Sequence, residues 1–151
     1  MFTGQYTHSL DTKGRVAIPK RVLARIPDQG NGRILHGTRG FDSCIFFVCT
    51  DEWERLVEKV EANSMGDEEA RQFTRVFYSW ACELTVDSSG RILVSPKYRD
   101  FLGLDPELPD RKEVFMLGCG KRIEFWLPAT WDGEIGTAEQ DYEKHAKRIL
   151  G

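Results

Sequence analysis

A short motif occurs twice in this chain and constrains its fold more than any other feature. Residues 11–15 are Asp-Thr-Lys-Gly-Arg, and residues 87–91 are Asp-Ser-Ser-Gly-Arg. Both copies lie between segments of alternating apolar residues, and their glycines adopt positive φ at little cost. A proline follows each copy, at Pro19 and Pro96, where it suits the first turn of a helix. We therefore predict two tight β-hairpins, each followed by a short helix.

The duplication extends beyond the motif. The segment 44–48 with Trp53 parallels the segment 122–126 with Trp131, and these tryptophans are 78 residues apart (53 to 131). The two motifs are 76 residues apart (11 to 87). A unit of this size buries too little surface to be stable alone. We expect the two halves to pack into one body.

Together with the segment 73–77, Phe-Thr-Arg-Val-Phe, these repeats resemble the MraZ family over nearly the whole chain. The resemblance implies an α+β, mainly β, fold: two SpoVT/AbrB-type swapped-hairpin domains, as β-barrel halves with short helices, that form a pseudo-dimer. It also implies a bacterial transcriptional regulator, a repressor of the division and cell-wall gene cluster that includes its own gene. Such a protein assembles into a homo-oligomeric ring and binds double-stranded promoter DNA with repeated short sites. The expected divisions are domain 1 at 5–52, a helical insert at 53–80, domain 2 at 81–130 and a C-terminal helical tail at 131–151.

Composition agrees with a soluble globular protein. The chain has 151 residues, of which 40% are hydrophobic and 30% are charged. No apolar run is long enough to span a membrane, and the first residues lack the blocks of a signal peptide, so we expect a cytoplasmic, nucleoid-associated protein. In that compartment the four cysteines are expected to be reduced, and we predict that they are buried.

Charge is distributed unevenly along the chain. The net charge of −3 argues against a nucleic-acid partner as a sum, but phosphate contacts are local. Residues 1–26 hold five Lys or Arg and one Asp, whereas residues 51–71 hold eight acids and three bases. The N-terminal unit is therefore predicted to be the basic face.

The first turn is the candidate DNA-binding element. Its predicted contact residues are Thr12, Lys13, Gly14 and Arg15, with Lys20 and Arg21 flanking them at a helix start. Arginine suits this role because its planar fork holds a phosphate or a guanine edge with two hydrogen bonds. In the structural alternative, Asp11 and Arg15 pair across their own turn.

The second turn has diverged from the first. Ser88 and Ser89 stand where the first copy has Thr12 and Lys13. Asp87, Gly90 and Arg91 are therefore either a second DNA contact or a structural motif in which Asp87 pairs with Arg91. We expect the first turn to face DNA and the second to hold the fold or the ring.

The remaining patterns predict secondary structure. Alternation indicates a strand at 5–10, in which His8 is a packed or hydrogen-bonded residue rather than a ligand. Apolar runs predict strand pairs at 33–36 with 44–49 and at 114–117 with 123–127. Helices are predicted at 51–63, capped by Asp51, and at 67–81, with Phe73, Phe77 and Trp80 packing between halves or subunits. Residues 137–140 match a capping box before a terminal helix.

Catalysis is not predicted. The Asp, His and Ser side chains in the two turn regions suggest no base, nucleophile and oxyanion arrangement, and no Gly-rich nucleotide loop occurs. Cys44 and Cys49 lack the spacing of a zinc site, so we expect no metal and no cofactor. The alternative function is an antitoxin-like or structural module whose turns bind protein. A retardation assay with promoter DNA at two salt concentrations separates these two functions.

Overall fold

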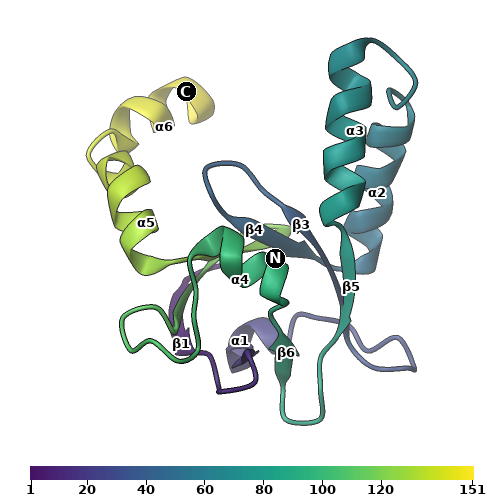
Figure 1. The fold of residues 1–151 in the computed structure, drawn as a ribbon. Coiled ribbons are helices and arrows are strands. Elements are labelled where there is room, and N and C mark those ends of the chain that lie inside the picture. The colour runs from purple at the N-terminus through teal and green to yellow at the C-terminus, as the bar shows by residue number, and fades with distance from the viewer.

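The computed structural model describes residues 1–151 as an α+β protein built mainly from strands (Figure 1). Its strands are β1 (Gln5–Ser9), β2 (Arg15–Ala17), β3 (Ile34–Arg39), β4 (Ile45–Val48), β5 (Cys82–Thr85), β6 (Arg91–Leu93), β7 (Glu113–Cys119) and β8 (Arg122–Trp126). Its helices are α1 (Lys20–Leu23), α2 (Thr50–Glu61), α3 (Glu68–Trp80), α4 (Pro96–Leu102), α5 (Pro128–Glu134), the 3₁₀ helix η1 (Gly136–Glu139) and α6 (Tyr142–Leu150). None of the helices is both long and apolar enough to cross a membrane.

The strands of the two repeats are interleaved. Six antiparallel strands form one sheet in the order β1-β7-β8-β4-β3-β5, and β2 pairs with β6 in a separate two-stranded ribbon. β1 of the first repeat pairs with β7 of the second, and β5 of the second pairs with β3 of the first. Exchanging the two repeats leaves the strand order unchanged. The chain is therefore a pseudo-dimer with an approximate two-fold axis between β4 and β8.

The prediction of two simple hairpins is wrong, and the swapped hairpins implied by the family resemblance are confirmed. Around the first turn the Asp11 N–H donates to the Arg15 carbonyl at 2.8 Å, as in a hairpin. β1 and β2 then separate, and Val16 of β2 lies opposite Ile92 of β6. Val16 and Ile92 are buried against the main sheet, and this burial selects a partner strand that local alternation cannot identify. The main sheet is open, with β1 and β5 at its edges, and is not closed into a barrel.

One core joins the two repeats. It lies between the ribbon and the main sheet and includes Val16 and Ile92 from the ribbon. Phe47 of β4 and Phe125 of β8 are fully buried there, with ring centroids 4.7 Å apart. Since each repeat supplies one of these rings, neither repeat has a complete core by itself. The expectation that the halves form one body is confirmed.

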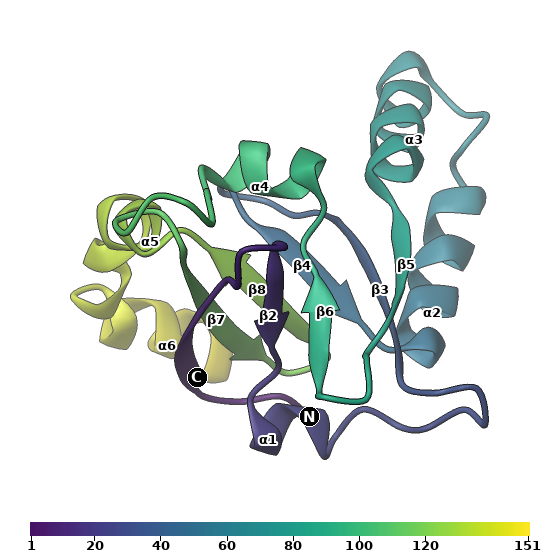
Figure 2. The ribbon, with the colours of Figure 1, turned by 60° about the horizontal axis from the view of Figure 1, so that its bottom comes forward.

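The longer helices cover the opposite face of the main sheet (Figures 1 and 2). α2 and α3 lie over β3, where the Trp53 ring stacks on His36 and the Thr38 hydroxyl donates to the Phe77 carbonyl at 2.9 Å. α5 lies over β7, where the Trp131 ring packs on Phe115 with centroids 5.0 Å apart. The ribbon and these helices therefore lie on opposite faces of the sheet.

Both predicted strand pairs, β3 with β4 and β7 with β8, are confirmed. The two helices predicted at 51–63 and 67–81 are present as α2 and α3. Asp67 caps α3 by accepting from the Ala70 N–H at 2.8 Å, and Gly103 ends α4 with a φ of 82°. The predicted cap at Asp51 is wrong, because α2 begins at Thr50 with no side-chain cap. The capping box at 137–140 is also wrong, because those residues fall in and beside η1 and make no side-chain cap.

Of the three aromatic residues on α3 that were predicted to pack between halves or subunits, two are packed within the chain and one is exposed. Phe77 is buried against Trp53, and Trp80 stacks on Tyr98 of the second repeat. Phe73 is 49% exposed. All four cysteines are free, but only Cys44 is fully buried, so the expected burial of the other three is not met.

Candidate nucleic-acid interface

The first turn is held by the Asp11 carboxylate. Its Oδ1 accepts hydrogen bonds from the N–H groups of Lys13 and Arg15, both at 2.9 Å. The Gly14 N–H donates to the Asp11 carbonyl at 3.0 Å, and Gly14 has a φ of 82°, a conformation that favours glycine. Thr12 and Lys13 are exposed at the tip of this turn.

The second turn repeats this geometry. Asp87 Oδ1 accepts from the Ser89 N–H at 2.8 Å and the Arg91 N–H at 3.0 Å, and Gly90 has a φ of 76°. The backbone hydrogen bond from Arg15 is the main cause that lowers the pKa of Asp11, and the one from Arg91 does the same for the pKa of Asp87. Both carboxylates are thereby kept ionised.

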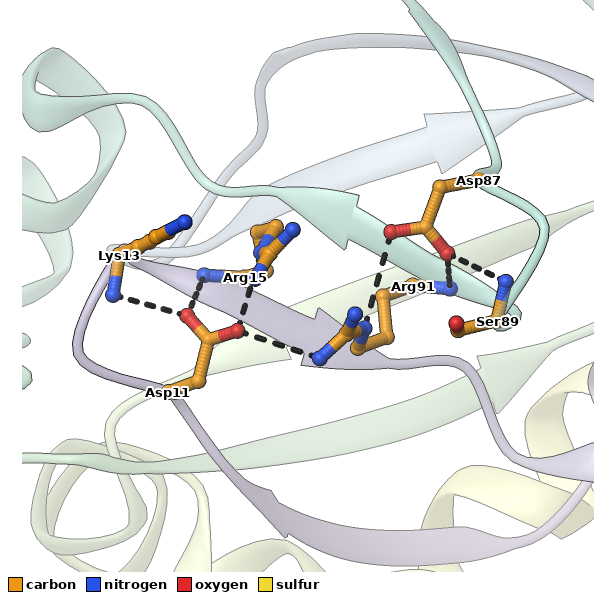
Figure 3. A network of polar contacts seen from close by, with 6 residues as sticks. All are labelled: Asp11, Lys13, Arg15, Asp87, Ser89 and Arg91. Atoms are coloured by element: carbon orange, nitrogen blue, oxygen red, sulfur yellow. Dashed lines mark hydrogen bonds and ion pairs between the residues drawn. The ribbon is translucent and has the colours of Figure 1, made fainter.

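A network of ion pairs lies on the outer face of the ribbon, between the two turns (Figure 3). Asp11 Oδ2 lies 3.0 Å from Arg15 Nε and 3.4 Å from Arg91 Nη1. Asp87 Oδ2 lies 3.6 Å from Arg91 Nε, which is buried and lacks a hydrogen-bond partner. The pairing of each aspartate with the arginine of its own turn is therefore present in both copies.

The two arginines differ in their use. Arg91 contacts the carboxylates of both turns, so it ties the two ends of the ribbon together. Arg15 is held only through Nε, its two terminal amino groups make no other bond, and its side chain is 32% exposed. Asp11 therefore orients Arg15 while leaving its terminal donors free.

Lys20 and Arg21 do not flank the first turn, contrary to the sequence prediction. β2 leads away from the first turn, and the Ile18 N–H bonds to the Gly90 carbonyl at 2.9 Å, so α1 starts beside the second turn. Figure 2 shows α1 at the end of the ribbon where the second turn lies and α4 at the opposite end. A three-residue strand spans about 10 Å, so the length of β2 separates Lys20 and Arg21 from Lys13. The cause is the swapped pairing, which sends each helix to the turn of the other repeat.

Sequence reasoning missed Arg99. This residue lies on α4, and its guanidinium rests on Gly14 so closely that a Cβ at Gly14 would overlap Arg99 Nη1. The Val94 N–H bonds to the Gly14 carbonyl at 2.9 Å, which anchors the start of α4 at the first turn. The swapped-hairpin resemblance was the one signal in the sequence that could have placed the second repeat's helix there.

Other chemistry-bearing groups have structural surroundings. His8 Nδ1 lies 2.7 Å from the Ala17 carbonyl, as expected for a hydrogen-bonded residue. Burial raises the pKa of the Cys44 thiol to about 12, which makes it a poor nucleophile. No group of three or more His, Cys, Asp or Glu side chains is placed to hold a metal ion.

Comparison with known proteins identifies the family of this chain. A family model described as "MraZ protein, putative antitoxin-like" matches the chain twice, at residues 1–76 and 77–151. The chain belongs to the MraZ family. Transcriptional regulator MraZ of Natranaerobius thermophilus is 36% identical over 150 residues, covering 99% of this chain and 97% of the relative. The protein of the same name from Halothermothrix orenii is 35% identical over 146 residues, covering 97% of this chain and 94% of the relative. The one from Acetivibrio thermocellus is 34% identical over 149 residues, covering 99% of this chain and 96% of the relative.

The two MraZ matches divide the chain inside α3, after residue 76. Each match contains one Asp-x-x-Gly-Arg turn and one half of the interleaved sheet. The MraZ repeat is therefore a unit of sequence, whereas the unit of packing is the pair of repeats.

Proposed function

We propose that this protein binds double-stranded DNA with the outer face of the β2–β6 ribbon and regulates transcription. The observation that carries the proposal is the first turn, where Lys13 is exposed and Arg15 is oriented by Asp11 with its terminal donors unpaired. Arginine donors held in advance can meet a phosphate or a guanine edge with little further loss of side-chain freedom. The names of the relatives, which are transcriptional regulators, support the same function.

Each subunit has little basic surface with which to hold DNA. The chain carries a net charge of −3, so its contacts to phosphate are few, and we place them chiefly at the first turn. Several weak contacts on one assembly raise the apparent affinity through effective concentration. We therefore propose that neighbouring subunits hold successive short repeats on one promoter. The target is the division and cell-wall gene cluster that includes the protein's own gene, which the protein represses while associated with the nucleoid.

Self-association through the helix-covered face provides these neighbouring subunits. Phe41 (79% exposed) and Phe73 (49% exposed) line an apolar groove of about 290 Å³ beside α2 and α3. At the other end of the molecule α6 exposes Tyr142 and Ile149, and its charged residues are mainly basic, whereas α2 and the start of α3 are acidic. Two different surfaces of opposite charge favour a head-to-tail contact between copies, which gives a ring when it closes. The ribbon lies on the other face of the sheet and stays free for DNA.

A protein-binding role is the second candidate, because the matching family model is described as antitoxin-like. In that case the turns contact a protein partner and the cationic tip has no preference for phosphate. Salt dependence separates the two functions. A protein that neutralises DNA phosphates releases the counterions condensed on them, so its binding weakens steeply as salt rises, and a protein partner has no such condensed counterions.

The test is a retardation assay with duplex DNA from the region upstream of the protein's own gene, at low and moderate salt. We expect binding that is stronger than to shuffled duplex and that weakens steeply as salt rises. A footprint on the same DNA should show several evenly spaced protected repeats. Equal binding of cognate and shuffled duplex under all conditions would refute sequence-specific regulation by this protein.

A further inference from the structure

We propose that Arg99 of the second repeat contacts a DNA phosphate together with Lys13 of the first, so that one DNA-binding site is built from both repeats. This inference rests on the proposed function. It adds a residue that lies 85 positions beyond the glycine of the first turn (14 to 99) and is placed against that glycine only by the swapped pairing.

α4 holds Arg99 in a defined position. Ser95 caps the helix by accepting from the Tyr98 N–H, and Gly103 ends it. Tyr98 is 3% exposed and its hydroxyl donates to the Trp80 carbonyl, while Leu102 is buried in the shared core. With both ends fixed and two side chains buried, the backbone at Arg99 cannot move away from the first turn without disrupting the core.

The guanidinium of Arg99 is free to bind a ligand. It makes no ion pair and no side-chain hydrogen bond, and it is half-buried against the backbone of Gly14. The other base on α4 is differently used: Lys97 Nζ donates to the Ser79 carbonyl at 2.9 Å and lies 4.3 Å from the Trp80 ring centroid. An unpaired guanidinium on the outer side of a glycine turn is suited to an anionic oxygen from outside the molecule.

The pseudo-two-fold axis supplies an internal comparison. At the second turn, the place of Arg99 against the turn glycine is taken by Leu23, whose Cδ2 lies 3.3 Å from where a Cβ of Gly90 would be. Ser89 replaces Lys13, and the adjoining recess is lined by Asp28 and Asp87 as well as Arg33. The same backbone therefore carries two free cations at the first turn and none at the matching positions of the second.

The ligand that this pair fits is a phosphodiester of the DNA backbone. Lys13 and Arg99 approach the same glycine from different segments, so both charges can reach one anionic group or two adjacent ones. Contacts of this type fix the position of a protein on the duplex without reading its bases. Arg99 should therefore contribute similarly to cognate and non-cognate DNA, whereas loss of a base contact reduces the preference between them.

The experiment compares Arg99→Ala with Arg75→Ala in the full-length protein. Arg75 is an exposed arginine on α3, on the opposite face of the sheet, so both variants remove one positive charge from a helix. Binding is measured by fluorescence anisotropy on a duplex with a single protected repeat and on a shuffled duplex, over a range of salt. We expect Arg99→Ala to weaken binding to both duplexes about tenfold and to reduce the slope of log K against log salt by about 1 per subunit bound. Arg75→Ala should match the parent protein.

Further variants keep the result interpretable. If Arg99→Ala lowers the melting temperature, Arg99→Gln keeps the aliphatic part of the side chain and a polar end group while removing the positive charge and the guanidinium over Gly14. The inference alone is overturned if the parent protein binds, Arg15→Ala weakens binding, and Arg99→Gln binds with the parent's affinity and salt slope. If the parent protein shows no salt-dependent binding to either duplex, the proposed function fails and the inference fails with it.

Discussion

Truncation of the two central phenylalanines tests whether the repeats form one cooperative unit. Phe47 and Phe125 come from different repeats, are fully buried and have ring centroids 4.7 Å apart. Replacing either by Ala removes a buried ring and leaves a cavity, which costs about 3–5 kcal/mol of unfolding free energy. For a chain of this length that loss lowers the melting temperature by about 6–20 °C.

The double variant provides the sharper measurement. Because the rings touch, the two losses should not add: the contact energy of an aromatic pair is about 0.5–1.5 kcal/mol, and the two cavities merge. Urea unfolding followed by tryptophan fluorescence and by circular dichroism should show one coincident transition in every variant. Phe115 of β7 packs on the other face of the sheet, so Phe47→Ala with Phe115→Ala should be additive within about 0.5 kcal/mol. Two separate transitions, or additive losses for Phe47 and Phe125, would show that the repeats fold independently.

Three further predictions follow from single residues. Burial lowers the pKa of His36, although the charges of Glu83 and Glu54 act to raise it. The contribution of neutral His36 to stability is therefore complete above the ordinary histidine pKa of about 6.5 and declines as pH falls. Urea midpoints near pH 7 and pH 5 should differ less for His36→Gln than for the parent protein, and an unchanged difference would contradict this. Phe73→Ser should lower the scattering mass of the assembly while Val76→Ser, on the same helix but outside the groove, leaves it unchanged, and equal masses for the two variants would exclude the groove as an interface. Gly14→Ala should lower the melting temperature more than Gly90→Ala, because both substitutions meet an unfavourable positive φ but only the first also displaces a guanidinium; equal effects would place Arg99 elsewhere.

Local features of the fold were predictable from the sequence, and long-range ones were not. Alternation around the two motifs predicted the strands, the glycines at 14 and 90 predicted the turns, and apolar runs predicted the strand pairs β3–β4 and β7–β8. The choice of β6 as the partner of β2 depends on burying Val16 and Ile92 together, which no short window of sequence contains. That choice was accessible only through the family resemblance.

The same limit explains why two members of the candidate site lie at a different turn from the one expected. Lys20 and Arg21 follow the first motif closely in sequence, but the swapped strand carries them to the second turn, and it brings Arg99 to the first. The pairing of Asp11 with Arg15 was foreseen from their spacing, whereas the reach of Arg91 to Asp11 joins residues 80 positions apart. Sequence neighbours are therefore a poor guide to the composition of a site in a swapped fold.

Photocross-linking from the tips of the two turns tests which of them faces DNA. Thr12 and Ser88 are exposed, occupy matching positions in the two repeats, and make no side-chain hydrogen bond. A benzophenone amino acid is placed at one position or the other, and the full-length protein is irradiated on duplex DNA from the region upstream of its own gene. We predict a covalent DNA adduct from position 12 and little or none from position 88, with both proteins assembled as the parent is. Equal adducts from both positions, or an adduct from position 88 alone, would contradict the assignment of the first turn as the DNA-facing element.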